Sequence, residues 1–121
     1  MGQLATFADA NRWLDKTKVR FENAADAQDE LAQATPIVRG YLVDLFPDDI
    51  DKWDVDPGLN EIAVPELVRE IVAMLMAAYR YQERYSEETF TESTFARGLE
   101  QRALQLLQDL RDGRISLADH P

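Results

Sequence analysis

The sequence predicts an all-α, mostly helical fold in a single domain that spans residues 1–121. Apolar residues recur every three or four positions in several segments, and helix-capping residues stand at the ends of those segments. The composition agrees, because 45% of the residues are hydrophobic and 30% are charged, which is typical of a globular chain. We expect about four helices, arranged as an antiparallel helical bundle around a long central helix.

Residues 6–14 are expected to form a short first helix. Thr6 is the predicted N-cap, with Asp9 at the capping-box position. The buried face of this helix would consist of Phe7, Ala10 and Leu14. In residues 16–21, bases then alternate with Thr, Val and Phe, which is a strand-like period. Six residues leave open whether a strand forms there.

A second helix is predicted over residues 24–46. Its apolar stripe consists of Leu31, Ala34, Val38, Leu42 and Leu45. Pro36 interrupts this stripe and cannot donate a backbone hydrogen bond. Either the helix kinks there, which we favour, or Thr35 caps a new helix with Pro36 at its first position.

Residues 47–64 are predicted to be a long acidic loop, rich in Asp, with two prolines and one glycine. Connections of this length inside a compact domain are often functional, and Trp53 in its middle is a candidate for partner binding. The acids do not fit the spacing of an EF-hand loop, so we expect a solvated loop and no metal site.

The third helix, residues 65–85, is predicted to be the central one. Two apolar stripes run along it side by side: Leu67, Ile71, Met74, Ala78 and Tyr81, and next to them Val68, Val72, Leu75 and Tyr79. A helix that is apolar on so much of its circumference is buried either in its own core or against other subunits. Because a chain of this length offers few neighbours, we expect other copies to cover part of this helix.

A fourth helix is predicted over residues 91–112, with Thr89 and Glu92 at capping-box spacing and Gly113 as the C-cap glycine. Its apolar face consists of Phe95, Leu99, Ala103, Leu106 and Leu110. Gly98 inside this helix indicates that another backbone approaches closely. Residues 114–121 form an extended C-terminal tail, in which Ile115 and Leu117 could dock as a short extended piece and whether a strand forms stays open.

The net charge is −10, and residues 24–63 carry ten acids against two bases. An acidic surface gains no affinity for nucleic acid from counterion release, so non-specific DNA binding is not expected. The N-terminus has no signal-peptide pattern, and the longest apolar run, residues 71–79, is too short to span a membrane.

The sequence offers no catalytic constellation. There is no cysteine, and the single histidine, His120, precedes the last residue, where nothing fixes its geometry. We therefore predict that the protein is not an enzyme and has no cofactor and no metal. The aromatic group Tyr79, Tyr81 and Tyr85 lies on a helix that also carries Arg80 and Arg84. Core packing together with protein–protein contact explains this group better than stacking on nucleic acid.

Four stretches together resemble the head–tail connector (adaptor, or head-completion) proteins of tailed bacteriophages. They are FADANRWL, ELAQATPIVRGYLVDLFP, VPELVREIVAMLMAAYRYQERY and FARGLEQRALQLLQDLRDGRISL, and they cover the chain from Phe7 to Leu117. In that family a helix precedes a variable loop, a long apolar helix with tyrosines near its end follows, and the last helix closes on Gly and a short apolar tail. Pro36 departs from this pattern.

The resemblance implies a structural virion protein of the phage neck, located at the head–tail junction of the virion and, during assembly, in the host cytoplasm. Its partners would be copies of itself in an oligomeric ring of about twelve subunits, the portal protein, and the next neck or tail-completion protein. DNA would pass through the ring without specific binding, and no membrane is involved. The partner-binding candidates are Trp53, Tyr79, Tyr81, Tyr85, Ile115 and Leu117. The alternative is another helical protein-binding module, such as a tail-completion factor or a small regulator of a host protein.

Overall fold

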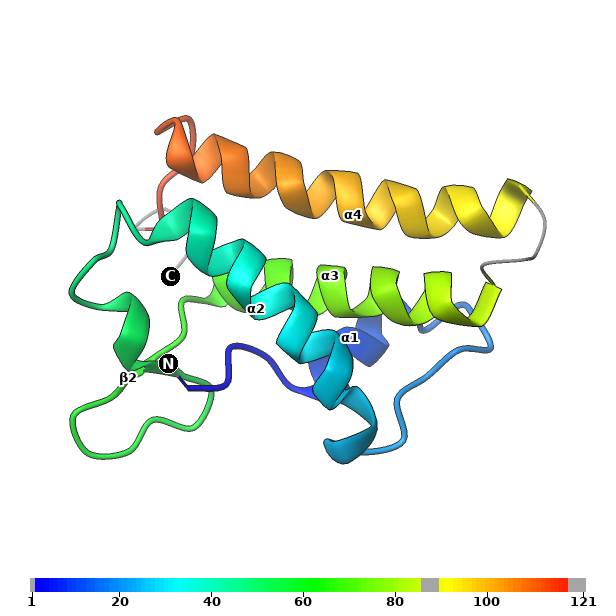
Figure 1. Ribbon diagram of the computed structural model, residues 1–121, viewed down its shortest axis with the longest axis horizontal. Coiled ribbons are helices and arrows are strands. Elements are labelled where there is room, and N and C mark those ends of the chain that lie inside the picture. Colours follow the sequence, from blue (N-terminus) through cyan, green and yellow to red (C-terminus); the bar gives the residue numbers. More distant parts are fainter. Residues whose placement is uncertain (1, 86–89, 118–121) are drawn as a thin grey trace.

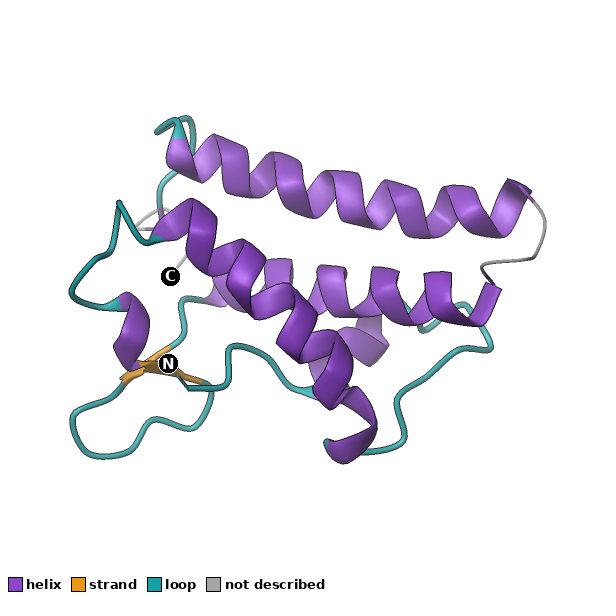
Figure 2. Cartoon of the chain, viewed as in Figure 1, coloured by secondary structure: helices purple, strands orange, loops and turns teal. Residues whose placement is uncertain are grey.

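The computed structural model describes residues 2–85 and 90–117, without the side chains of 84–85 and 90–93. Four α-helices, two 3-10 turns and a two-stranded sheet follow one another along the chain (Figures 1 and 2). In order they are α1 (Phe7–Trp13), η1 (Ala25–Ala27), α2 (Gln28–Leu42), η2 (Ile50–Lys52), β1 (Trp53–Asp54), β2 (Ile62–Ala63), α3 (Glu66–Tyr85) and α4 (Phe90–Arg111). The mostly helical fold predicted from the sequence is confirmed.

The helix α3 is the centre of the molecule. It packs against α1, α2 and α4, and α4 runs antiparallel beside it along the long axis (Figure 1). The helix α2 crosses obliquely over α3 and also contacts α4. The α3 helix therefore has neighbours from its own chain on most of its circumference.

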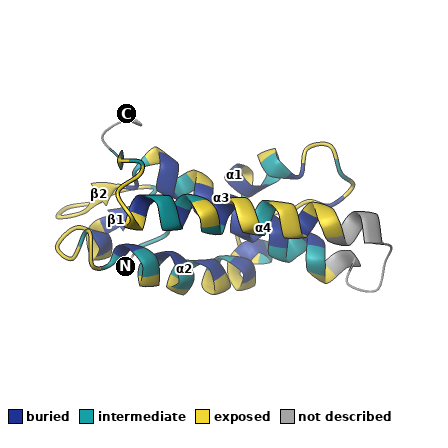
Figure 3. Ribbon diagram, turned by 90° about the horizontal axis from the view of Figure 1, so that it is seen from above, coloured by how far each residue is buried: buried dark blue, intermediate teal, exposed yellow. Residues whose placement is uncertain are grey.

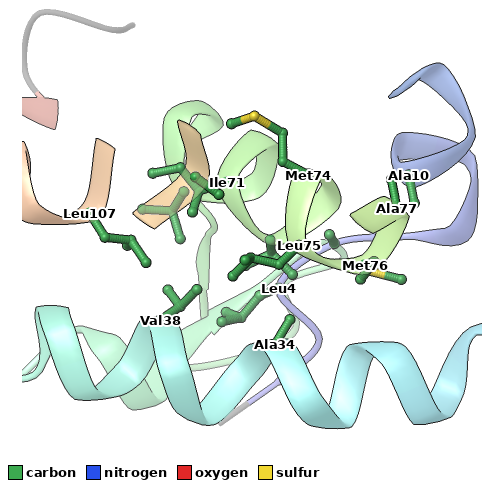
Figure 4. Packing of buried hydrophobic residues seen from close by; sticks show 14 of the residues in the cluster. Leu4, Ala10, Ala34, Val38, Ile71, Met74, Leu75, Met76, Ala77 and Leu107 are labelled. Carbon is green, nitrogen blue, oxygen red and sulfur yellow. The ribbon is translucent and has the colours of Figure 1, made fainter. Parts of the chain in front are cut away.

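The two apolar stripes of α3 are buried within the single chain. Residues 71–78 are all buried, and Tyr81 as well. Figure 4 shows how this is done: Ala10 of α1 lies beside Ala77, while Leu4 and Leu75 lie over the α2 helix. The expectation that other copies cover part of this helix is wrong, because α1, α2 and α4 cover it together with the N-terminal segment. The N-terminal segment is the neighbour that a count of helices leaves out.

The predicted start of α1 is confirmed in detail. The backbone N–H of Asp9 donates to the Thr6 hydroxyl over 3.2 Å, and the Asp9 carboxylate accepts from the Thr6 N–H over 2.9 Å. These reciprocal hydrogen bonds satisfy two donors that an uncapped helix would leave unpaired. The first helix is therefore determined by its local sequence.

The α2 helix is shorter than predicted and is not interrupted. It begins at Gln28 after a 3-10 turn, continues through Pro36 and ends at Leu42, so the alternative of a new helix starting at Pro36 is wrong. The Thr35 hydroxyl donates to the Leu31 carbonyl over 2.8 Å, one turn back, beside the position where the proline has no N–H to donate. Leu45, predicted to lie on the apolar stripe, follows the helix end and is exposed.

Residues 16–21 form no strand. Thr17 closes a turn on the Leu14 carbonyl, and the Asn11 side chain accepts from the Phe21 N–H over 2.8 Å and donates to its carbonyl over 3.0 Å. The alternation nevertheless predicts burial correctly, because Val19 and Phe21 face the core. The side chain of Asn11 takes the place of a neighbouring strand.

The α4 helix ends as predicted at a glycine. Gly113 has φ +78°, its N–H donates to Leu110, and the N–H of Arg114 donates to Asp109 over 2.8 Å, which is a Schellman motif. At Gly98 the expectation is wrong: an added Cβ would meet no atom within 4 Å, so no other backbone approaches there. The predicted capping residue Thr89 lies outside the described residues.

Candidate protein-binding site

The loop between α2 and α3 forms one end of the molecule and is anchored by two buried side chains. Ile50 and Trp53 point into the core, and the rings of Trp53 and Phe46 lie 5.5 Å apart. Trp53 is only 2% exposed. The prediction that Trp53 is a partner-binding residue is therefore wrong, because the Asp-rich sequence around it conceals that the indole closes the end of the core.

A small sheet fixes the backbone of the same loop. The strands β1 and β2 are parallel, with Trp53 opposite Ile62 and Asp54 opposite Ala63. On the other edge of β1, the Gly2 N–H donates to the Trp53 carbonyl and the Val55 N–H donates to the Gln3 carbonyl. The N-terminal segment thus lies along β1, and the loop is held by groups on both sides.

Three large apolar side chains of this loop are exposed to solvent. Leu59 is 92% exposed, Leu45 43% and Ile62 39%. In the described part of the chain one more large apolar side chain, Phe95 of α4, is exposed to a similar degree as Ile62. Large apolar side chains that stay exposed on one segment of a folded domain are typical of a protein-binding surface.

Acidic residues flank these apolar ones along the sequence. Residues 44–63 carry seven acids and one base, Lys52. The exposed carboxylates are those of Asp44, Asp48, Asp49, Asp51, Asp56 and Glu61. Asp51 is bound by Arg39 of α2 through two hydrogen bonds of 3.1 and 3.2 Å from the same guanidinium nitrogen. We call the surface formed by residues 44–63 the acidic end; it is the exposed end next to β1 and β2 in Figure 3.

The acids of this end do not gather around one point. Among the described residues, no group of three or more His, Asp or Glu side chains is placed to hold a metal ion. Besides Asp51, which is bound by Arg39, two carboxylates bind backbone: Asp54 accepts from the Gln3 and Asp56 N–H groups, and Glu61 from the Gly58 N–H. The acidic end therefore offers a charged surface around apolar side chains.

A hollow of about 500 Å3 lies between α1 and the first turns of α3. Its lining consists of Asp9, Arg12, Trp13, Val64, Glu66, Arg69, Glu70 and Ala73. The Arg69 Nε donates to Asp9 over 2.6 Å. Burial by itself would raise the pKa of Asp9, but the hydrogen bonds from Arg69 and Thr6 outweigh it and hold that pKa below its ordinary value. A carboxylate that stays ionised in this way does not transfer protons near neutral pH.

Arg80 belongs to a second buried polar cluster. Its guanidinium donates to Asp26 over 2.7 Å and to Glu30 over 3.4 Å, and it lies 4.9 Å from the centre of the Phe21 ring. Burial raises the pKa of Glu30, and the nearby Arg80 charge offsets part of this shift. Burial by itself would lower the pKa of Arg80, but Asp26 and Glu30 raise it. The cluster ties residues 20–30 to α3, so Arg80 is not part of a nucleic-acid surface.

The predicted aromatic and C-terminal candidates do not form a common face. Tyr81 is buried against Phe95, with ring centres 4.7 Å apart, whereas Tyr79 is half-buried and burial raises its pKa. The Tyr85 side chain lies outside the described residues. Ile115 and Leu117 are half-buried and pack against the core, so the tail docks on its own chain.

The residues that sequence reasoning missed are Leu45, Leu59 and Ile62. A detectable signal was present, because a leucine and an isoleucine among Pro, Gly, Asn and Glu in residues 57–62 have no helical stripe to join. Comparison with protein-family models, with curated proteins and with solved structures returns no match to this chain. In the described residues, no helix has the length and apolar character that a membrane crossing needs.

Proposed function

We propose that the chain is a structural subunit of the head–tail connector of a tailed bacteriophage. In this role it binds copies of itself, the portal protein and the next neck or tail-completion protein, and it performs no catalysis. The observation that carries the proposal is the acidic end, where exposed apolar side chains stand on a backbone fixed by β1, β2 and the N-terminal segment. A surface that is ordered before binding loses little conformational entropy when a partner docks.

The polar clusters support a binding role and not a catalytic one. In both clusters the buried carboxylates are engaged by arginines: Asp9 by Arg69, and Glu30 by Arg80. General acid–base chemistry needs a group whose pKa is placed near the working pH and which faces a substrate. Asp9 has its pKa shifted the opposite way, and Glu30 is 2% exposed and faces an internal cluster.

The charge supports passage of DNA without binding. A net charge of −10 repels phosphate groups, and several of the exposed bases are already paired with acids. We therefore expect no gel shift of duplex DNA at physiological salt. A salt-sensitive complex with DNA under those conditions would contradict this part of the proposal.

The self-association in this proposal rests on exposed surfaces only. The apolar faces of α3 are covered by the chain itself, so they offer no interface to a neighbour. Among the described loops, the large apolar side chains that are exposed and could contact a neighbour are the leucines and the isoleucine of the acidic end.

Electron microscopy of the purified chain with the portal complex of the phage that encodes it tests the proposal. We expect added ring density on one face of the portal. Leu59→Asp should abolish it, because a charge in the centre of a docking surface would be desolvated. Gln101→Asp, at an exposed position of α4, is the matched control and should leave the density unchanged.

A folded chain that leaves the portal bare would refute the connector role. If that chain instead formed a stable dimer through the acidic end, another helical protein-binding module would be the better description.

A further inference from the structure

We infer that the acidic end of one copy docks onto the segment 12–20 of the next copy, which we call the basic turn. The inference rests on the proposed function, because it assigns the contact by which connector subunits meet one another. It follows from three features of the described residues: complementary charge, position at opposite parts of the molecule, and a matching apolar contact.

The basic turn carries four bases and one acid. Arg12, Lys16, Lys18 and Arg20 are all exposed, and Asp15 is the single acid among them. Arg20 and Asp15 are 3.9 Å apart and both well exposed, which makes a weak ion pair. Lys16 and Lys18 have no ion-pair partner among the described residues.

The backbone of the basic turn is as well fixed as that of the acidic end. Val19 and Phe21 are buried, Thr17 closes the turn on Leu14, and Asn11 binds both backbone groups of Phe21. The bases are therefore presented on a preformed surface. Complementary preformed charge raises the association rate and fixes the register of a contact.

The two surfaces lie far apart on one molecule. In Figure 1 the acidic end is at the left, whereas the turn after α1 lies at the opposite side, below the end of α3. Figure 3 shows the same separation from above. One copy cannot join its own two surfaces, and two acidic ends would repel each other. A contact that runs from the acidic end of each copy to the basic turn of the next is heterologous, which is the kind that closes into a ring when the rotation fits.

An apolar contact accompanies the charged one. The acidic end presents Leu59, whose side chain is almost fully exposed. The basic turn includes Trp13, a half-buried ring that lines the hollow between α1 and α3. We place Leu59 of one copy against Trp13 of the next, with the carboxylates of the acidic end facing Lys16 and Lys18.

Charge reversal with sedimentation analysis tests the contact. The first variant, Asp48→Lys with Asp49→Lys, makes the acidic end less negative; the second, Lys16→Glu with Lys18→Glu, makes the basic turn negative. The wild type should self-associate at about 50 mM salt. Its affinity should fall by a factor of about ten or more at about 500 mM salt, because screening shortens the reach of surface charges. Each variant alone should lose at least about tenfold in affinity.

An equimolar mixture of the two variants should restore association, as a complex that stops at two chains. In that mixture the unchanged acidic end of the second variant meets the unchanged basic turn of the first, and the two altered surfaces, which are both net negative, do not pair. Arg97→Glu with Arg111→Glu, on exposed positions of α4, carries the same charge change as the second variant and is the control that should associate like the wild type.

The absence of cysteine provides an independent measurement. Leu59→Cys mixed with Lys16→Cys should form a mixed disulfide under a mild oxidant, faster than Leu59→Cys mixed with Arg97→Cys.

Several results would overturn the inference: a wild type that stays monomeric at about 1 mM in low salt, a mixture that does not associate, or equal cross-linking in the control pair. Ring density on the portal that persists with Lys16→Glu and Lys18→Glu would also overturn it while leaving the connector role intact. Conversely, salt-dependent self-association with no portal binding would support this contact and refute the connector role.

Discussion

At the scale of single residues, Asp9 connects a local and a long-range interaction. Its carboxylate accepts from Thr6 at the start of α1 and from Arg69, sixty residues later on α3. Its folded-state pKa is lowered, so the stability it supplies is present above the ordinary value of 3.8 and is lost as the pH falls through the folded pKa. One side chain thus both caps a helix and fixes how that helix docks.

Trp53 is predicted to be essential for stability. Trp53→Ala should lower the free energy of unfolding by about 3–5 kcal/mol, because it leaves a cavity next to Phe46 and Ile50. Urea unfolding followed by circular dichroism measures the loss. Trp13→Ala, at a half-buried position, is the matched control and should cost less than half as much. Equal losses would show that the indole does not close the core.

Arg80 is predicted to stabilise the fold in a pH-dependent way. Arg80→Met leaves Glu30 buried without its cation and should cost about 3 kcal/mol at pH 7. Burial places the folded-state pKa of Glu30 above its ordinary value of 4.5. Protonation of Glu30 therefore stabilises the folded state as the pH falls from the folded-state pKa to the ordinary value. The difference in unfolding free energy between variant and wild type should therefore shrink as the pH falls toward the folded-state pKa of Glu30.

Thermal or urea unfolding at several pH values measures this dependence. Arg111→Met removes a cation that lies over the Tyr41 ring and forms no ion pair among the residues that the structure describes, so its effect should be small and independent of pH in the same range. A pH-independent loss for Arg80→Met would mean that Glu30 is not the group left uncompensated.

At the scale of elements, the two glycines of the α4 region have opposite roles. Gly113 ends the helix with a positive φ, which residues with a Cβ adopt at a cost. Gly98 lies inside the helix, is exposed and has open space around it. Glycine is therefore favoured at position 113, where the helix ends, and unfavourable at position 98, inside the helix.

Gly98→Ala should stabilise the protein by about 0.5–1 kcal/mol, because alanine loses less backbone entropy in a helix. Gly113→Ala should destabilise it by about 1 kcal/mol, because the left-handed conformation is strained with a Cβ. The midpoint of urea unfolding, measured for both variants in parallel, checks the pair. Destabilisation by Gly98→Ala would indicate that a neighbour does approach that face.

At the scale of the whole molecule, one core and two charged surfaces coexist. The helices α1, α2 and α4 pack around α3, so the apolar side chains of this long helix are buried in the core of the single chain. In the role that we propose, binding falls to the loops: the acidic end with Leu59, and the basic turn with Lys16 and Lys18. A structural subunit of this design can keep its core rigid while the loops determine the partner.

Leu75→Asp is predicted to prevent folding, because it places an unpaired charge where α2, α3 and the N-terminal segment meet. The free energy lost should approach the whole stability of a domain of this size, about 5–15 kcal/mol. Far-ultraviolet circular dichroism and size-exclusion chromatography distinguish an unfolded chain from a folded one. Leu45→Asp, the same substitution at an exposed position, should keep the wild-type spectrum.

Much of the fold could be predicted because its signals are local. The capping box of Thr6 and Asp9, the stripes of α3 and the closing glycine of α4 each act within a few residues. The prediction failed for Leu45, where the stripe continues in the sequence but the helix does not, and for residues 24–27, where a 3-10 turn precedes the helix. Helix ends without a capping side chain are determined by what packs beyond them.

The loop that forms the candidate site was predicted from sequence, but which of its side chains are exposed was not, because exposure depends on neighbours that are distant along the chain. Trp53 looks like an exposed anchor in an acidic loop, yet the bonds from Gly2 and Gln3 and the ring of Phe46 place it inside. Ile62 looks like an ordinary loop residue, yet it belongs to β2 and is exposed there, and Leu59, three residues earlier, is 92% exposed.

The sequence by itself determined the helical class, the central position of residues 66–85 and the acidic character of one segment, because periodicity, capping and charge are properties of neighbouring residues. Only the tertiary structure decided that α3 is covered by its own chain and that Trp53 is buried while Leu59 is not. Burial depends on contacts between segments that are far apart in sequence. The N-terminal segment, which pairs with β1 and places Leu4 in the core beside α3, makes contacts that no local sequence pattern predicts.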